Sequence, residues 1–228
     1  MHIDADTFIF FGALIVAVIL HEISHGVVAL WFGDDTAKRA GRLTLNPIPH
    51  IDPFGSIILP AMGALTGIPV IGWAKPVPVN PRQLRRPREQ MVFVSLAGPT
   101  TNFILAAIGA AVAHFFFTRM DLGLQAALLQ LPSRLLVLDV LRDLPIGFVI
   151  AYSFAFVNVF LGLFNLIPIP PLDGSAIFEL FMPDEWRAGW YKFRPYGLLV
   201  LFALVFWTGI ISTILTPFVH VLDGIIVS

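Results

Sequence analysis

Four long apolar stretches constrain the fold of this chain more than any other feature. A helix needs about 20 apolar residues to cross the ~30 Å hydrocarbon core of a bilayer. None of the four contains Lys, Arg, Asp or Glu except for Glu22 in the first. Hydrophobic residues make up 57% of the 228 residues and charged residues only 13%. A soluble domain normally contains about 25% charged residues, so this composition does not suit one. We therefore predict an all-α polytopic membrane protein with about four transmembrane helices, over residues 8–32, 91–118, 146–167 and 196–219.

A fifth apolar stretch, residues 54–72, is rich in Pro and Gly, and we predict a re-entrant or embedded hairpin there. If this hairpin does not cross the membrane, eleven of the fourteen Lys and Arg residues fall on one side, which the positive-inside rule makes cytoplasmic. The prediction is a multi-pass protein of the cell membrane with both termini outside. Asp4 and Asp6 precede the first stretch and no small-residue cleavage pattern follows, so this stretch is expected to remain in the mature protein. Residues 1–228 are expected to form a single membrane domain, with residues 33–90 as a loop region on the cytoplasmic side.

The net charge and the absence of cysteine exclude several classes of function. A formal net charge of −1, with basic residues confined to loops, gives no electrostatic surface for nucleic acid. The chain has no cysteine, which excludes disulfides and thiolate chemistry. Any metal site must therefore use imidazole and carboxylate ligands.

The sequence HEISH, His21 to His25, lies inside the first predicted span. On a helix its two histidines share one face, with Glu22 beside them. Both imidazoles can bind Zn²⁺ while the glutamate takes a proton from a zinc-activated water. A chance match is disfavoured, because unsatisfied ionisable groups are costly within a bilayer.

A catalytic zinc site uses three protein ligands and keeps one position open, and Asp173 is the candidate third ligand. The third span ends in NLIPIPPLDGS, where prolines break the helix just before Asp173. Broken helices within membranes are tolerated where they line a cavity. Asn165, eight residues earlier, could donate a hydrogen bond to the substrate carbonyl or to the oxyanion formed on it. The alternative for Asp173 is a turn or helix-capping role in its Asp-Gly pair.

The expected depths of these residues in the membrane favour the metal site. His21 lies thirteen residues after Phe8, or about 20 Å along a helix, in the cytoplasmic half of the first span. Asp173 follows the cytoplasmic end of the third span, and Asn102 lies near the cytoplasmic start of the second. The active site is therefore expected toward the cytoplasmic side.

Three motifs in this order resemble the site-2 proteases, a family of intramembrane zinc metalloproteases. They are HEISH at 21–25, AGPTTN at 97–102, and the pattern Asn165, Pro168, Leu172, Asp173, Gly174. The segments RAGRLTLNPIPHIDPFGS and GWAKPVPVNP are similar to a short bacterial and archaeal branch that lacks PDZ and CBS domains.

The resemblance implies one zinc ion per chain held by His21, His25 and Asp173, with Glu22 as general base. It implies that Asn165 assists the oxyanion or the substrate backbone; for Asn102 a catalytic contribution and helix packing stay open. It also implies short β-strands on the cytoplasmic side, in residues 33–90, which could present an edge to an extended substrate. The expected partners are the lipid bilayer and single-span membrane proteins, which are cut within or beside the bilayer. The sequence does not indicate an oligomeric state.

The alternative function is a metal-binding membrane transporter or a non-catalytic binding module, since intramembrane His and Asp residues also mark ion pathways. Transporters more often contain paired broken helices, and the sequence has a single one. Two other polar residues are predicted to have structural and not catalytic roles. His50 is expected to be a surface or loop-stabilising residue, and Asn158 to hydrogen-bond between helices.

Overall fold

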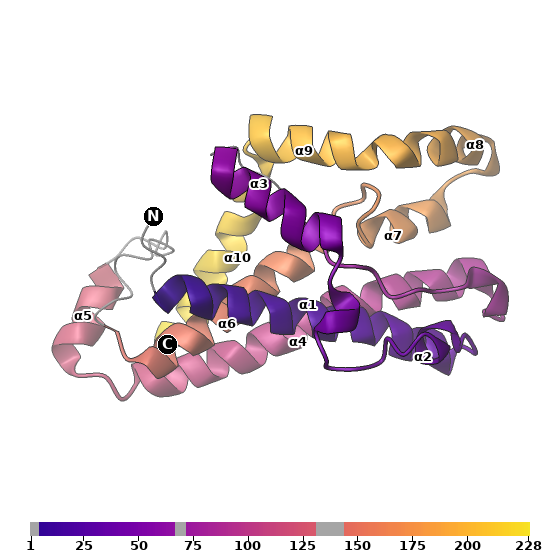
Figure 1. Cartoon of the computed structure of the whole chain (residues 1–228). Coiled ribbons are helices and arrows are strands. Elements are labelled where there is room, and N and C mark those ends of the chain that lie inside the picture. The colour runs from indigo at the N-terminus through magenta and orange to yellow at the C-terminus, as the bar shows by residue number, and fades with distance from the viewer. Residues whose placement is uncertain (1–4, 67–71, 131–143) are drawn as a thin grey trace. The chain divides into compact units, whose positions relative to one another are not determined.

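The computed structural model describes residues 5–66, 72–130 and 144–228, and within these ranges the chain is helical (Figure 1). Among the described residues, four helices are long and apolar enough to cross a membrane: Thr7–Trp31, Pro87–Phe117, Ile146–Asn165 and Ile210–Val227. The predicted number of candidate spans is confirmed. In chain order the elements are α1 (Ala5–Trp31), α2 (Thr36–Arg39), η1 (Ile48–His50), η2 (Pro53–Ile58), α3 (Leu59–Thr66), η3 (Pro81–Gln83), α4 (Pro87–Phe117), α5 (Leu122–Gln130), α6 (Ile146–Asn165), α7 (Gly174–Phe181), α8 (Asp184–Phe193), η5 (Arg194–Tyr196), α9 (Gly197–Trp207) and α10 (Ile210–Val227).

The chain divides into two compact units. The first, which we call the helix unit, comprises Met1–Ala17, Thr100–Phe164 and Gly209–Ser228. The second, the loop unit, comprises Val18–Pro99 and Asn165–Thr208.

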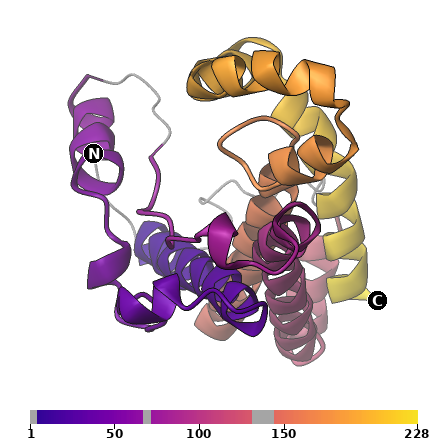
Figure 2. The ribbon, with the colours of Figure 1, turned by 90° about the vertical axis from the view of Figure 1, so that its right-hand side faces the viewer.

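Small residues let the helices of the helix unit pack closely. A Cβ added at Gly109 of α4 would lie 2.9 Å from the backbone nitrogen of Ala155 on α6, so these two helices touch backbone to backbone. Ala110 and Ala113 of α4 are buried in the same core. In Figure 2, α10 runs beside these helices, and the Tyr152 hydroxyl of α6 donates a hydrogen bond to Asp223 of α10 at 2.9 Å. Close approach through small residues is how helices associate in lipid, where no hydrophobic effect drives them together.

A buried amide pair joins α4 to α6 at a point where both side chains are fully enclosed. Asn102 Nδ2 donates to Asn158 Oδ1 at 2.8 Å, and Asn158 Nδ2 donates to the Phe154 carbonyl at 2.8 Å. The predicted interhelical role of Asn158 is confirmed. For Asn102 this contact supports the packing role that the sequence left open.

The amide pair should be energetically coupled. In a double-mutant cycle of Asn102→Ala and Asn158→Ala, we expect a coupling free energy of about 0.5–1.5 kcal/mol, the range for polar contacts between helices in membranes. Reversible unfolding of the four proteins in mixed micelles measures this coupling. Strictly additive effects would contradict a direct hydrogen bond between the two amides.

The fourth predicted span, residues 196–219, has the wrong boundaries. The helix that begins at Gly197 ends at Trp207, and Gly209 adopts a left-handed conformation with φ of 63°. A new helix then starts at Ile210 and supplies the candidate span. Continuous apolar composition concealed this break, because only the glycine marks it.

The predicted short β-strands are also wrong, because no strand occurs in the described part of residues 33–90. Residues 72–80 are extended but contain two prolines, which cannot donate to a strand ladder. The predicted hairpin at 54–72 begins as the helical turns of η2 and α3, which together cover Pro53–Thr66. This helical stretch is shorter than the ~20 residues needed to span a bilayer, and residues 67–71 lie outside the described part of the chain.

Candidate metal centre

The HEISH sequence forms part of α1, and helical geometry brings its two histidines together. His21 and His25 are both buried, and their Nε2 atoms lie 3.0 Å apart. The ring centroids are 4.6 Å apart and the ring planes nearly perpendicular. Both rings therefore direct the same nitrogen toward one point, as the spacing of four residues predicts.

Asp173 meets this histidine pair from the chain that follows α6. Its Oδ2 lies 3.1 Å from His21 Nε2 and 3.4 Å from His25 Nε2. Asp173 occupies the N-cap position of α7, yet its side chain makes no capping hydrogen bond. The helix-capping alternative for Asp173 is therefore wrong, since the carboxylate faces the imidazoles.

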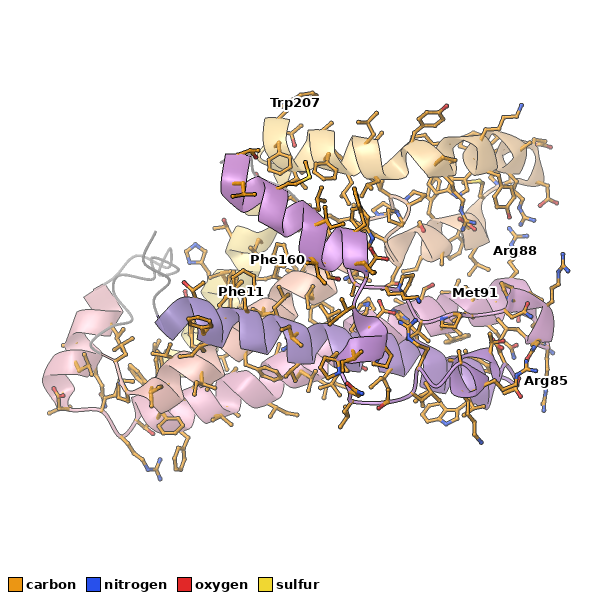
Figure 3. All side chains as sticks on the ribbon, in the orientation of Figure 1. Phe11, Arg85, Arg88, Met91, Phe160 and Trp207 are labelled. Carbon is orange, nitrogen blue, oxygen red and sulfur yellow. The ribbon has the colours of Figure 1, made fainter. Side chains whose placement is uncertain are left out.

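Glycine at position 174 allows this arrangement. A Cβ there would overlap the carbonyl group of Leu166, so the chain can fold back against the end of α6 only with glycine beside the aspartate. Arg88, at the start of α4, secures the other end of α7. Its Nη2 donates to the carbonyls of Leu180 at 2.6 Å and Met182 at 3.1 Å, and Figure 3 shows this side chain reaching toward the turn after α7.

The three side chains fit a zinc ion. Their ligand atoms are separated by 3.0, 3.1 and 3.4 Å, close to the roughly 3.3 Å between neighbouring ligands in a tetrahedral site with bonds of about 2.0–2.1 Å. Asp173 Oδ2 is buried and receives no well-directed hydrogen bond, so the imidazoles alone do not satisfy it. In the described part of the chain this is the one cluster of three such side chains whose ligand atoms all lie within 4.8 Å of one another.

The protonation states also suit a cation. Burial would raise the pKa of the Asp173 carboxyl, but the facing imidazoles of His21 and His25 outweigh burial and lower this pKa below its ordinary value of 3.8. The carboxylate is therefore ionised at neutral pH. His25 Nδ1 lies 2.7 Å from the Val94 carbonyl, which can only accept, so Nδ1 carries the proton. In the neutral ring this leaves a lone pair on Nε2, the nitrogen that faces the site.

Gly98 of α4 is a site residue that sequence reasoning missed. A Cβ at this position would lie 2.5 Å from His21 Nε2 and 2.6 Å from His25 Cε1. Only glycine lets α4 approach the histidine pair this closely. The available signal was the Gly98-Pro99 pair, an unusual choice within a helix.

Gly98→Ala should therefore displace the imidazoles. We expect at least a tenfold loss of zinc affinity, because the added methyl group overlaps both rings. Gly12→Ala is the matched control, since a Cβ at Gly12 of α1 meets nothing within 4 Å. Zinc titration of both purified variants measures the effect. Equal affinity in the two variants would show that α4 does not confine the histidines.

Glu22 and Asn165, two further residues of the predicted site, also belong to the loop unit. Glu22 follows His21 on α1, is partly buried, and accepts a hydrogen bond from the backbone N–H of Val77 at 2.7 Å. Asn165 is the last residue of α6 and is half-buried. Asn102 belongs to the helix unit, where it bonds Asn158. His50 is buried, so a surface position is wrong for it, and its Nε2 is hydrogen-bonded to the Thr44 carbonyl at 3.0 Å, which supports the loop-stabilising role.

The described part of the chain has four apolar helices that could cross a membrane. It also has an HExxH motif whose two histidines face an aspartate. Together these features define a multi-pass membrane protein of the metalloprotease class. A profile of peptidase family M50 matches residues 9–207, nearly the whole chain. The chain therefore belongs to peptidase family M50, the site-2 protease family of zinc metalloproteases, as its motifs predict.

Related proteins agree with this assignment. The chain is 40% identical over 210 residues to "Putative zinc metalloprotease YwhC" of Bacillus subtilis, covering 91% of this chain and 84% of that protein. It is 30% identical over 191 residues to "Putative zinc metalloprotease Rip2" of Mycobacterium tuberculosis, covering 83% and 63% respectively. It is 23% identical over 178 residues to "Zinc metalloprotease MJ0392" of Methanocaldococcus jannaschii, covering 78% and 35%. No solved structure matches the chain.

Proposed function

We propose that this metalloprotease binds one zinc ion per chain through His21, His25 and Asp173 and hydrolyses peptide bonds of membrane-anchored proteins. The observation that carries the proposal is the convergence of three ligand atoms within 3.4 Å of one another, next to a glutamate on the same helix. Zinc fits this donor set because imidazole and carboxylate ligands are those it takes in catalytic sites.

The proposed mechanism divides the chemistry between the metal and the chain. Zinc, when bound, supplies a Lewis acid that polarises the scissile carbonyl and acidifies water. Glu22 takes the proton from the attacking water and returns it to the leaving amine, as a general base and then a general acid. Asn165 donates a hydrogen bond to the substrate carbonyl or to the oxyanion formed on it. Asn102 contributes by holding α4 against α6 through Asn158.

The membrane setting defines the proposed substrates. His21, Glu22 and His25 lie within the candidate span Thr7–Trp31, so a peptide bond must reach them within or beside the bilayer. Single-span membrane proteins meet this requirement. The distribution of Lys and Arg supports a site toward the cytoplasmic side of the cell membrane.

Cleavage by purified protein tests the function. Full-length protein in liposomes should cut a co-reconstituted single-span substrate, lose this activity when a chelator removes the metal, and regain it with added zinc. Zinc flux into the liposomes without any cleavage would instead support the transporter alternative. Glu22 argues against transport, since moving an ion requires no base beside its ligands.

A further inference from the structure

An extended segment of the loop unit, residues 73–80, lies along α1 and is fixed at intervals of two or three residues. We call this segment the strap. Val77 is buried above Gly26 of α1, where a Cβ would approach Val77 Cγ1 to 3.1 Å. Four of its backbone N–H groups donate hydrogen bonds: Trp73 to the Gly55 carbonyl (3.3 Å), Lys75 to the His50 carbonyl (2.9 Å), Val77 to Glu22 Oε2 (2.7 Å) and Asn80 to Asp34 Oδ2 (2.6 Å).

Two of these acceptors are carboxylates at or just after α1, which makes both bonds charge-assisted. Asp34 is fully buried. Burial would raise the pKa of its carboxyl, but hydrogen bonds from the Thr36 hydroxyl and the Asn80 N–H hold this pKa below the ordinary value of 3.8. Asp34 is thus ionised at neutral pH and anchors the C-terminal end of the strap. On the other side of Val77, Arg42 Nη2 donates to the Lys75 carbonyl at 2.5 Å.

The prolines of the strap leave one backbone N–H donor between them. Pro76 and Pro78 flank Val77 in the sequence KPVPVN, and proline has no N–H. Across residues 76–78 the Val77 N–H is therefore the sole backbone donor, and it is directed at Glu22. This pattern does not suit pairing with a substrate strand, which needs alternate free donors. It does suit a single fixed contact.

We propose that the strap positions Glu22: the Val77 N–H holds the carboxylate by Oε2, so that Oε1 is presented as the proton acceptor in peptide hydrolysis. The proposal rests on the proposed function of Glu22 and adds a residue that acts through it. Held between fixed anchors on both sides, the Val77 N–H restricts the carboxylate to one orientation. A general base works only within hydrogen-bond reach of its proton, so a freely rotating carboxylate would spend little time in the productive geometry.

Hydrogen exchange tests the contact independently of catalysis. In the zinc-loaded, full-length protein in lipid nanodiscs, the Val77 amide should exchange at least tenfold faster in Glu22→Ala than in the wild type. The Asn80 amide, held by Asp34, should be unaffected and serves as the internal control. Because Pro76 and Pro78 have no amide, peptides covering the strap contain few exchangeable sites and Val77 can be resolved. Equal exchange at Val77 in the two proteins would overturn the proposal.

Kinetics test the positioning role. Val77→Pro removes the donor and should lower kcat roughly 10- to 100-fold, as expected for losing a hydrogen bond to a charged group, with zinc content and KM close to wild type. Val77→Ala keeps the N–H and loses only side-chain packing, so the kcat of Val77→Ala should be at least tenfold higher than that of Val77→Pro. A raised KM with unchanged kcat would assign the strap to substrate binding, and a raised kcat would make it an inhibitory cover; either result overturns the proposal.

The strap proposal and the proposed protease function can be disproved separately. If wild-type protein cleaves substrate and Val77→Pro cleaves it equally well, the strap proposal is wrong while the protease function stands. If the wild type cleaves nothing, the proposed function fails, and the exchange experiment still reports whether Val77 and Glu22 are bonded.

Discussion

Replacing Glu22 by Gln should leave zinc binding at the wild-type level and lower kcat for peptide hydrolysis by at least about 10³-fold. Gln matches Glu in size and still offers an oxygen to the Val77 N–H, so the strap should stay in place. What it loses is the ability to take a proton, and general bases contribute about 10²–10⁴-fold to rates. Single-turnover cleavage in liposomes, together with metal analysis of the same sample, measures both quantities.

Glu89→Gln is the matched control for this prediction. Glu89 is an exposed carboxylate in the first turn of α4, paired with Arg86 at 3.5 Å, and exposed pairs contribute little to stability. Cleavage by this variant should equal that of the wild type. Undiminished proteolysis by Glu22→Gln would end the assignment of Glu22 as the base.

Replacing Asp173 by Ala should abolish both zinc binding and cleavage. The change removes one of three converging ligand atoms and leaves two imidazoles, and a catalytic zinc site normally keeps three protein ligands. We expect at least a 100-fold loss of zinc affinity, more than the 10- to 100-fold typical of groups that only orient a ligand. Competition with a calibrated chelator measures this affinity.

Asp184→Ala provides the comparison for the aspartate. Asp184 lies in the first turn of α8, its side chain is 83% exposed, and it pairs with Arg187 at 3.2 Å. Its removal should change neither zinc affinity nor cleavage. Zinc affinity of Asp173→Ala within threefold of the wild type would mean that another side chain is the third ligand.

The sequence predicted the components of the site because their spacing has a direct geometric meaning. HEISH places two imidazoles on one helical face whatever surrounds it. The proline-broken end of α6 marks where an aspartate can leave the helix. The structure brings these residues together as predicted, with separations of 3.0–3.4 Å.

The surroundings of the site could not be predicted in the same way, because they depend on contacts between distant segments. Gly98 follows His21 by 77 positions, and its role appears only when a Cβ is placed against the imidazole rings. Likewise, nothing in the local sequence of residues 72–80 indicated that the Val77 N–H would bond Glu22. The β-strand prediction failed for the same reason, because the backbone N–H groups of residues 73–80 bond to side chains and loop carbonyls and not to a neighbouring strand.

The fourth span illustrates a different limit. Residues 196–219 are almost uniformly apolar, so hydropathy sets no boundary within them. The boundary comes from the backbone conformation of Gly209, and a glycine within an apolar stretch is compatible with either a continuous or a broken helix.

X-ray absorption at the zinc edge tests the central claim most directly, because it reports the ligands of the bound ion. The purified full-length protein should contain one zinc per chain, coordinated by two imidazoles and by oxygen ligands at about 2.0–2.2 Å. The same spectrum from Asp173→Ala should lack this signature. A wild-type spectrum with one imidazole or none would contradict a zinc site built from His21, His25 and Asp173.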